Sequence, residues 1–380
     1  MLILITGCNG YIGNAVTQKM LVKGHKVVGV DNNVKNKWLK ELNSVSAIDV
    51  PKNRKKELQK WYDNFEFYKL DIYKEVQKLE KLFQKYRFDT IINLAQMPSA
   101  PYSQIDLKHA SWTIQNNSIG TLNILWLIKE YCPDTHLVEI ESMGTFKPDI
   151  NTDIPENKFQ FTYNGRVSEP CLFPKEVGSY YHSSKLFNTY LNDCANRWWD
   201  IKSTIINQGV VYGNYTNEIE ETDIHSHLSV DESFGTVINR FIVQAMLQYP
   251  LTIYGSGNHK RGFLALNDSV QCLDLLVHNP PEEKEMRIIN QLDEVYSINE
   301  VADKVLFTLF GNNKNKQYIE SPRAENTEDF YYNPHTDILK SLNFRQTRTI
   351  EDEVKFAYEN INRKRLSQLK NLILPNIYWR

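Results

Sequence analysis

The stretch "SYYHSSK", Ser179 to Lys185, combines two tyrosines with a lysine. On a helix, residues four apart lie on one face, so Tyr181 would lie over Lys185, whereas Tyr180 would lie over Ser184. A tyrosine that acts as a base near neutral pH needs a phenol pKa well below its usual value of about 10, and a lysine ammonium one turn away favours the phenolate. The spacing predicts Tyr181 as the base, Lys185 as its partner, and Tyr180 as a neighbour that packs or binds sugar.

Two other polar groups could complete such a site. The stretch "HLVEIES" is predicted to be a strand that ends at Ser142, and ligands bind at the carboxyl ends of strands in a parallel sheet. A hydroxyl there can hydrogen-bond a reacting alcohol and stabilise its alkoxide. Asn117, in "NNSIGT", could anchor the helix that carries Tyr181, or a water that serves Lys185.

A glycine-rich loop predicts a phosphate site. "TGCNGYIG" places Gly7, Gly10 and Gly13 directly after the apolar run "LILIT" and at the start of a helical pattern. A diphosphate needs close backbone approach with free N–H groups, and a helix N-terminus adds a favourable dipole. The loop residues predicted to contact the cofactor are Gly7, Asn9, Gly10, Tyr11, Ile12 and Gly13.

An aspartate at the end of the second strand selects the cofactor. Asp31, followed by Asn32, can accept both ribose hydroxyls, and its charge would repel a 2′-phosphate, so NAD is predicted in preference to NADP. The alternative is an ordinary turn with a surface aspartate. Asp71 and Ile72 stand where an adenine edge could be held, although Asp71 could equally cap a helix. The predicted cofactor set is completed by Leu94, Ala95, Asn117, Tyr181, Lys185, Gln208 and Val210.

The elements that must position these residues alternate between strand and helix patterns. Short, continuously apolar runs such as 2–6 and 26–31 are typical of strands buried on both faces of a parallel sheet. The alternation predicts an α/β fold with a Rossmann-type doubly wound parallel sheet and a smaller α/β substrate-binding domain. The expected boundaries are a dinucleotide-binding domain at 1–211, to which 263–295 returns, and a nucleotide-sugar-binding domain at 212–262 and 296–380.

Composition excludes several classes of protein. The 380 residues carry a net charge of −2, which argues against a nucleic-acid or acidic-membrane partner, and the basic run "PKNRKKELQK" is predicted to be a solvated helical face. No apolar run reaches membrane-spanning length. Five scattered cysteines without a CxxC pair indicate reduced thiols and a cytoplasmic location. "HSH", His225 to His227, lacks further ligands at metal spacing, so it is predicted to be a solvated loop and no metal is expected.

The glycine loop, Asn117 before "IGT", Ser142 and the Tyr181–Lys185 pair together resemble the extended short-chain dehydrogenase/reductases, the NAD-dependent epimerase/dehydratase family. The stretches "SAPYSQID", "YNGR", "NQGVVYG" and "PLTIYGSGNHKRGF" resemble the UDP-sulfoquinovose synthase-like branch of that family. This resemblance implies a UDP-sugar bound between two domains, and a homodimer built through a four-helix bundle. The residues that it implies for substrate binding are Ser99, Tyr102, Arg166, Gln208, Arg240, Thr252, Tyr254, Arg261 and Arg323.

Two departures from that branch bear on the reaction. The synthases carry a motif that resembles Thr-Met-Gly-Glu-Tyr-Gly, where this chain reads "SMGTFK", so Thr145 replaces a carboxylate. Pro98 stands where the synthases carry an arginine before "SAPYS". Elimination across C5–C6 of a 4-ketosugar needs a group that removes the C5 proton and another that protonates the leaving hydroxyl, and threonine suits neither task. His182 or a group on the substrate could stand in.

The resemblance implies that Tyr181 takes the proton of the sugar 4-hydroxyl while hydride passes from C4 to NAD, which gives a transient 4-ketosugar. Because the carboxylate is missing, net redox-neutral isomerisation is favoured over addition of sulfite. The first alternative is a UDP-sulfoquinovose synthase that uses UDP-glucose and sulfite. A more remote alternative is a non-catalytic NAD-binding regulator, since a fold does not settle a function.

Overall fold

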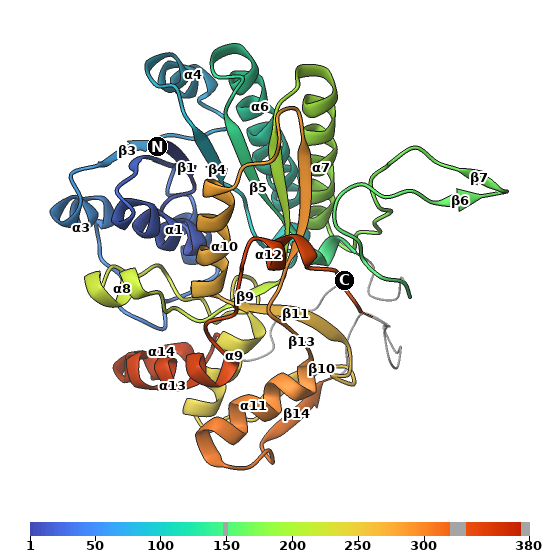
Figure 1. Ribbon diagram of the computed structural model, residues 1–380. Helices are drawn as coiled ribbons and strands as arrows, with labels where there is room; N and C mark the ends of the chain where they lie inside the picture. The colour runs from blue at the N-terminus through green and yellow to red at the C-terminus, as the bar shows by residue number, and fades with distance from the viewer. Residues whose placement is uncertain (147–150, 320–331, 374–380) are drawn as a thin grey trace.

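The computed structural model describes residues 1–146, 151–319 and 332–373, and a seven-stranded parallel sheet forms its centre (Figure 1). The strand order is β12-β8-β5-β4-β1-β2-β3. The chain moves outward from β1 in one direction and then returns to continue in the other, which is the doubly wound topology that the sequence predicted. The strands are β1 (Leu2–Thr6), β2 (Lys26–Asp31), β3 (Phe65–Lys69), β4 (Thr90–Asn93), β5 (His136–Ser142), β8 (Ser203–Gln208) and β12 (Met286–Gln291).

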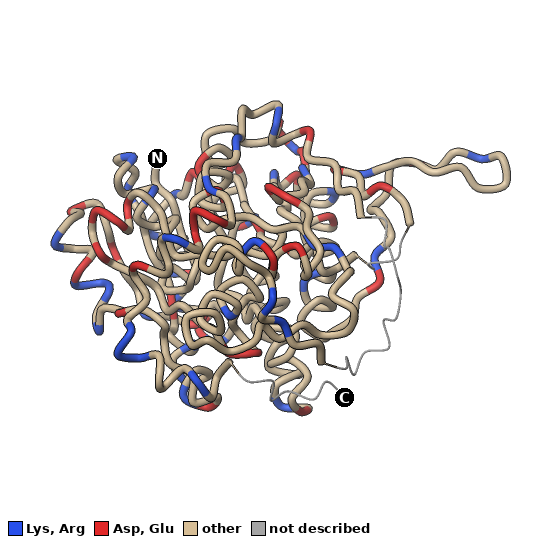
Figure 2. The backbone as a smooth tube through the Cα atoms, turned by 90° about the horizontal axis from the view of Figure 1, so that it is seen from below, with Lys and Arg blue, Asp and Glu red and all other residues tan. Residues whose placement is uncertain are grey.

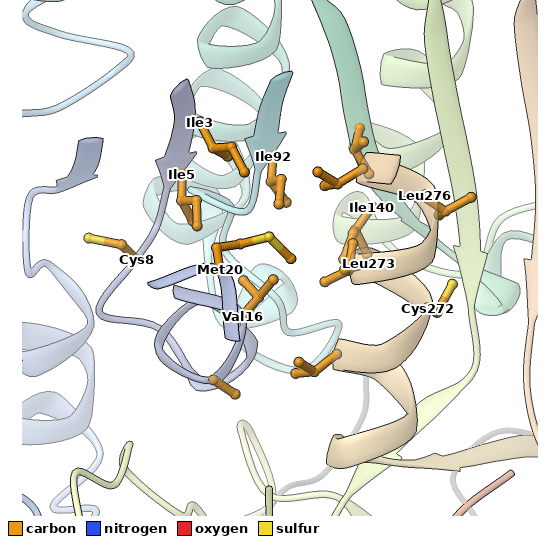
Figure 3. Close-up of a cluster of buried hydrophobic side chains, with 14 of the residues drawn as sticks. Ile3, Ile5, Cys8, Val16, Met20, Ile92, Ile140, Cys272, Leu273 and Leu276 are labelled. Atoms are coloured by element: carbon orange, nitrogen blue, oxygen red, sulfur yellow. The ribbon is translucent and has the colours of Figure 1, made fainter. Parts of the chain in front are cut away.

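Helices cover both faces of this sheet (Figure 1). One face packs on α1 (Tyr11–Val22) and α10 (Leu266–His278), which contact each other. In Figure 3, Val16 and Met20 of α1 and Leu273 of α10 converge with Ile5 and Ile92 of the strands. The other face packs on α4 (Val76–Lys85), α6 (Gly120–Tyr131) and α7 (Tyr180–Trp199). Both faces of the strands are buried, which is why they read as continuous apolar runs.

A smaller body of mixed structure lies beyond the carboxyl ends of the strands (Figure 1). It has its own core, in which Phe241, Ile253, Phe263 and Val301 are buried. Its strands are β9 (Val210–Tyr212), β10 (Leu251–Tyr254), β11 (Lys260–Ala265), β13 (Glu294–Ser297) and β14 (Lys316–Ile319). Its helices are α9 (Val237–Met246), α11 (Ile298–Phe310), α13 (Ile350–Asn360) and α14 (Leu366–Leu369). The division into two domains at the boundaries given above stays a prediction.

Several shorter helices and turns complete the described structure. They are α2 (Lys35–Glu41), α3 (Arg54–Trp61), α5 (Leu107–Ile114), α8 (Asn217–Thr222), α12 (Asp337–Ser341), a π-helical turn (Gln115–Ile119) and short 3₁₀ turns at Tyr102–Gln104, Met143–Thr145 and Arg363–Arg365. A hairpin of β6 (Thr162–Tyr163) and β7 (Arg166–Val167) extends away from the rest of the molecule (Figures 1 and 2).

Charged residues of both signs are interspersed along the described backbone (Figure 2). No described helix is long and apolar enough to cross a membrane. Among the described residues, no group of three or more histidine, cysteine or acidic side chains is arranged to hold a metal ion.

Candidate active site

A cavity of about 840 Å³ opens at the carboxyl edge of the sheet, between the two bodies. Its walls combine the glycine loop, the ends of β2, β4 and β5, and residues of the smaller body such as Phe234 and Asn239. A cavity of this size at this edge is where a doubly wound sheet binds its ligand. The predicted site residues that line it are Gly7, Asn9, Gly10, Tyr11, Ile12, Gly13, Asp31, Asn32, Ile72, Leu94, Ala95, Ser142, Tyr181, Lys185 and Gln208.

The glycine loop is packed so tightly that two of its glycines have no room for a side chain. Gly7 has φ +70°, and a Cβ there would lie 2.5 Å from the carbonyl oxygen of Leu94. A Cβ on Gly13 would lie 2.0 Å from the carbonyl oxygen of Gly7. The loop therefore presents bare backbone to the cavity at the N-terminus of α1. This cradle fits a diphosphate.

Asp31 is the last residue of β2, and its carboxylate lies beside the glycine loop. Its carboxylate accepts hydrogen bonds from the backbone N–H groups of Asn9, at 3.0 Å, and Asn33, at 2.6 Å. Burial raises the pKa of Asp31, and these two N–H groups and the Arg54 guanidinium oppose the increase. The aspartate thus lies beside the loop at a position from which it could accept ribose hydroxyls, and the residues present fit a dinucleotide.

Tyr181, Lys185 and Ser142 meet at the same edge, on α7 and at the end of β5. The helix begins after Ser179, whose hydroxyl accepts the N–H of His182 and caps it. The Lys185 Nζ lies 5.8 Å from the centre of the Tyr181 ring, and Tyr181, Lys185 and Ser142 all line the cavity. Tyr180 points away, with its side chain 55% exposed. The predicted difference between the two tyrosines thus agrees with their positions.

The ionisation of Tyr181 depends on its burial as well as on Lys185. Burial is the largest influence and raises the pKa of Tyr181 above its usual value, and the charge of Glu141 acts in the same direction. The charge of Lys185 lowers the pKa of Tyr181, which is the direction that the sequence predicted, and Ser142 also lowers it. The sequence does not show how deeply the phenol is buried, so it could not give the opposing effect of burial.

Lys185 is tied into a polar network below the cavity. Its ammonium donates to the side-chain oxygen of Gln96 and to the carbonyl oxygen of Ile140. The amide nitrogen of Gln96 in turn donates to Glu139 on β5. Burial raises the pKa of Glu139 to about 7, and the charge of Lys185 opposes that increase.

Asn117 makes one of the contacts that the sequence predicted. It lies in the π-helical turn, and its amide donates to the Ser184 hydroxyl at 2.9 Å, which joins that turn to α7. Its oxygen accepts the N–H of Met97 at 2.8 Å. Asn117 therefore positions α7 from below and does not itself line the cavity.

Thr145 and His182 lie beside the cavity and do not line it. The Thr145 side chain is buried, and its hydroxyl donates to the carbonyl oxygen of Ser142 at 2.8 Å. The ring of His182 approaches Gly144 so closely that a Cβ there would lie 2.4 Å from Nε2. Its other ring nitrogen lies 2.9 Å from the Ser179 hydroxyl. Threonine thus supplies no acid or base where the synthases resembled above have a carboxylate.

Asp71 does not cap a helix, the alternative role that the sequence left open, because α4 begins after Glu75. Its carboxylate accepts the N–H groups of Tyr73 and Lys74 and so closes the turn after β3. It also accepts the side-chain amide of Asn32 at 2.9 Å. Asp71 does not line the cavity. Val210, another predicted cofactor residue, does not line it either, although its neighbour Val211 does.

Most of the predicted substrate-binding residues lie outside the cavity wall. Tyr102 donates its hydroxyl to Glu41, at 2.8 Å, and is buried in an aromatic cluster, while Ser99 donates to the carbonyl oxygen of Ser233. Arg166 is exposed in the β6–β7 hairpin. Four predicted substrate-binding residues of the smaller body do not line the cavity: Arg240, Thr252, Tyr254 and Arg261. A fifth, Arg323, lies outside the described residues. Their role in substrate binding stays a prediction.

Sequence reasoning missed that the segment between β2 and α3, together with the start of α3, covers the cavity. Lys35, Trp38 and Arg54 line the wall, and the Arg54 guanidinium donates to the carbonyl oxygen of Asn9 at 2.5 Å. The prediction of a solvated basic face was therefore wrong for Arg54. The separate prediction of a solvated loop at His225 to His227 was wrong for His227, which lines the cavity. A segment rich in lysine and asparagine has no periodicity that would reveal its cover of a ligand site.

Comparison with known proteins agrees with this geometry. Residues 3–290 match the family model described as the NAD dependent epimerase/dehydratase family. The chain belongs to this family. Its cofactor is NAD, and the glycine loop and Asp31 described above fit that dinucleotide.

Individual relatives show which members of this family the chain resembles. The chain is 35% identical to a UDP-sulfoquinovose synthase of Sulfolobus acidocaldarius, over 100% of this chain and 98% of that protein. It is 33% identical to the chloroplastic UDP-sulfoquinovose synthase of Spinacia oleracea, over 100% of this chain and 79% of that protein. Among solved structures, a UDP-glucuronic acid 4-epimerase from Bacillus cereus aligns with a TM-score of 0.67 at 20% identity, covering 97% of this chain and 100% of that one, and it shares the fold.

Proposed function

We propose that this epimerase/dehydratase family member converts a nucleotide sugar, with UDP as the favoured nucleotide, through a transient 4-ketosugar. One observation carries the proposal: Tyr181, Ser142 and Lys185 line the same cavity as the glycine loop. The named relatives act on UDP-sugars, which supports UDP as the nucleotide.

In this mechanism, Tyr181 accepts the proton of the sugar 4-hydroxyl, and Ser142 donates a hydrogen bond to the oxygen that becomes the carbonyl. Lys185 stabilises the deprotonated phenol by its charge. Bound NAD would accept hydride from C4 and return it, so that the overall reaction is redox-neutral.

The step after oxidation is proposed to be isomerisation. Thr145 is buried and its hydroxyl is engaged with a backbone carbonyl, so no carboxylate at that position removes a C5 proton. Pro98 lines the cavity and has no charge to attract sulfite. General acid–base help is typically worth about 10²–10⁴-fold, and its loss favours return of hydride to the ketone.

A second candidate is a UDP-sulfoquinovose synthase, because identity to two such enzymes extends over the whole chain. Incubation with UDP-glucose and sulfite separates the candidates. We expect isomerised UDP-sugar and little or no sulfonated product. In deuterated water, deuterium should enter only if C3 or C5 is the centre inverted. Efficient sulfite-dependent formation of UDP-sulfoquinovose would overturn the isomerase proposal and assign the chain to the synthases.

A non-catalytic NAD-binding regulator remains the remote alternative. The presence of Tyr181, Ser142 and Lys185 around one cavity argues against it, since a regulator has no need of a proton acceptor at this edge. Absorbance of reduced nicotinamide distinguishes the two. Mixing the NAD-loaded protein with a panel of UDP-, dTDP-, CDP-, ADP- and GDP-sugars should give transient reduction with at least one sugar. A regulator would give none with any of them.

We further propose a homodimer built through α6 and α7. Their outer faces carry large side chains that are exposed in the single chain, among them Trp126, Phe187, Tyr190 and Trp198. Contiguous apolar surface of this kind marks an interaction site. A cytoplasmic location is proposed because the cysteines of the described residues are all free thiols. Sedimentation of the purified protein tests the dimer.

A further inference from the structure

A buried carboxyl group that has no part in the mechanism above lies directly next to Ser142. Glu141 is the penultimate residue of β5, and its side chain is 2% exposed. Neither of its carboxyl oxygens has a hydrogen-bond partner of good geometry among the described residues. A buried carboxyl without partners is costly when ionised, and such groups cluster at functional sites.

Two ammonium groups are brought to Glu141 by contacts with its neighbours. Lys185 donates to the carbonyl oxygen of Ile140, the residue immediately before Glu141. On the other side, Lys175 donates to the side-chain oxygen of Asn207 at 2.9 Å, and Asn207 is the residue of β8 that pairs with Glu141. Glu141 therefore lies between the lysine that serves Tyr181 and a second, partly buried lysine.

These groups influence one another's protonation. Burial raises the pKa of Glu141 well above its usual value; the charge of Lys185 lowers it, that of Glu139 raises it, and that of Lys175 lowers it. Burial lowers the pKa of Lys175 to about 8, and the charge of Glu141 opposes this shift. The negative charge of Glu141 in turn raises the pKa of Tyr181. The groups that face Glu141 thus come from α7, from β5 and from the segment before α7.

We propose that Glu141 is a positioning residue that controls, together with Lys185, whether Tyr181 holds or releases its proton. While Glu141 carries a proton, the charge of Lys185 is uncompensated and stabilises the phenolate. Once Glu141 ionises, its charge lies close to both groups and opposes the phenolate. Lys175 sets the point at which this happens, because its charge favours the ionised carboxylate.

This inference rests on the proposed role of Tyr181 as proton acceptor, but its test needs no sugar. The absorbance of tyrosinate is titrated in the NAD-loaded protein and in its Tyr181→Phe variant, and the difference isolates Tyr181. The same pair of titrations is repeated with Glu141→Gln, which keeps the shape of the side chain and cannot ionise. We expect the midpoint of Tyr181 to move to lower pH by on the order of one unit. An unchanged or higher midpoint overturns the proposal.

Glu156→Gln is the matched control. Glu156 is also a carboxyl whose pKa is raised by burial, but its oxygens accept the backbone N–H groups of Ile338 and Asn290, and neither Lys185 nor Tyr181 is among the groups that shift its pKa. It should leave the midpoint of Tyr181 in place. An equal shift in this control would show a general effect of removing buried charge and would overturn the role given to Glu141.

Lys175→Arg supplies a second test that remains if Glu141→Gln fails to fold. Burial lowers the pKa of Lys175 to about 8, so its ammonium loses its charge before the phenol titrates, whereas a guanidinium keeps its charge. A nearby cation that acted directly would lower the midpoint of Tyr181. The proposal predicts the opposite sign, because the guanidinium keeps Glu141 ionised and the carboxylate opposes the phenolate. In the double variant Glu141→Gln/Lys175→Arg, this rise should vanish. A lower or unchanged midpoint in the single Lys175 variant contradicts the proposal. Such a result would leave the sugar assays, and with them the proposed function, untouched.

Discussion

Replacement of Tyr181 by phenylalanine tests the central assignment, because the structure separates this residue sharply from the adjacent tyrosine. The Tyr181 ring packs against the cluster of Trp38, Met97 and Tyr102, and phenylalanine can keep these contacts. Only the hydroxyl is lost, together with its capacity to accept a proton. The fold and the bound NAD should therefore be retained.

The magnitude follows from the chemistry that is removed. A positioned proton acceptor is typically worth about 10²–10⁴-fold in rate. Each factor of ten corresponds to about 1.4 kcal/mol, so the barrier should rise by roughly 3–5 kcal/mol. Tyr180→Phe is the matched control, because the Tyr180 side chain is 55% exposed and points away from the cavity. Its rate should change by less than about threefold, the size expected for an exposed substitution within roughly 0.5 kcal/mol.

The assay is the rate of nicotinamide reduction in a single turnover with the sugar that proves active, and NAD content is measured after denaturation of each variant. Loss of turnover with full NAD content in Tyr181→Phe, and near-normal turnover in Tyr180→Phe, is the expected pattern. If Tyr180→Phe is the inactive variant, or if the two variants lose the same factor, the assignment by helical spacing and burial is refuted.

Three further changes probe the cofactor end and the junction of the two bodies. Asp31→Ala should weaken NAD and relax discrimination against NADP, which equilibrium titration of both dinucleotides would show; equal affinity of the wild type for the two would contradict the role of Asp31. Gly13→Ala should abolish retention of NAD, because its Cβ would lie 2.0 Å from the Gly7 carbonyl oxygen, and full NAD content in that variant would contradict the cradle. Burial and the neighbouring Asp268 raise the pKa of Asp293, so the folded state holds a proton that the unfolded chain releases, and this stability is present at low pH and lost as pH rises. In Asp293→Asn this pH-dependent loss of folding free energy, up to about 1.4 kcal/mol per pH unit, should disappear. The thermal midpoint of the variant should therefore decline less from pH 6 to pH 9 than that of the wild type, and parallel declines in the two proteins would contradict the prediction.

Several features of this protein were determined by the local sequence. The run Leu2–Thr6 is β1 with the predicted bounds, because a strand buried on both faces needs an unbroken apolar run whatever surrounds it. The three glycines predicted a tight loop before a helix, and the structure has that loop at the start of α1, where Gly7 and Gly13 leave no room for a Cβ. Tyr181 was chosen over Tyr180 from helical spacing alone, because positions four apart share a face in any helix.

Other features depend on residues that meet only in the folded chain. Arg54 reaches the glycine loop across more than forty positions of sequence, and its basic neighbours gave no sign of it. Glu141 acquires its character from Lys185 on α7 and from Lys175 beside β8, which the register of the sheet brings together. Burial depth, and with it the ionisation of Tyr181, is likewise a property of what packs above a residue. Periodicity reports which face of an element is apolar, but the electrostatic state of a side chain depends on distant partners and on the water they exclude, and these are decided by tertiary structure.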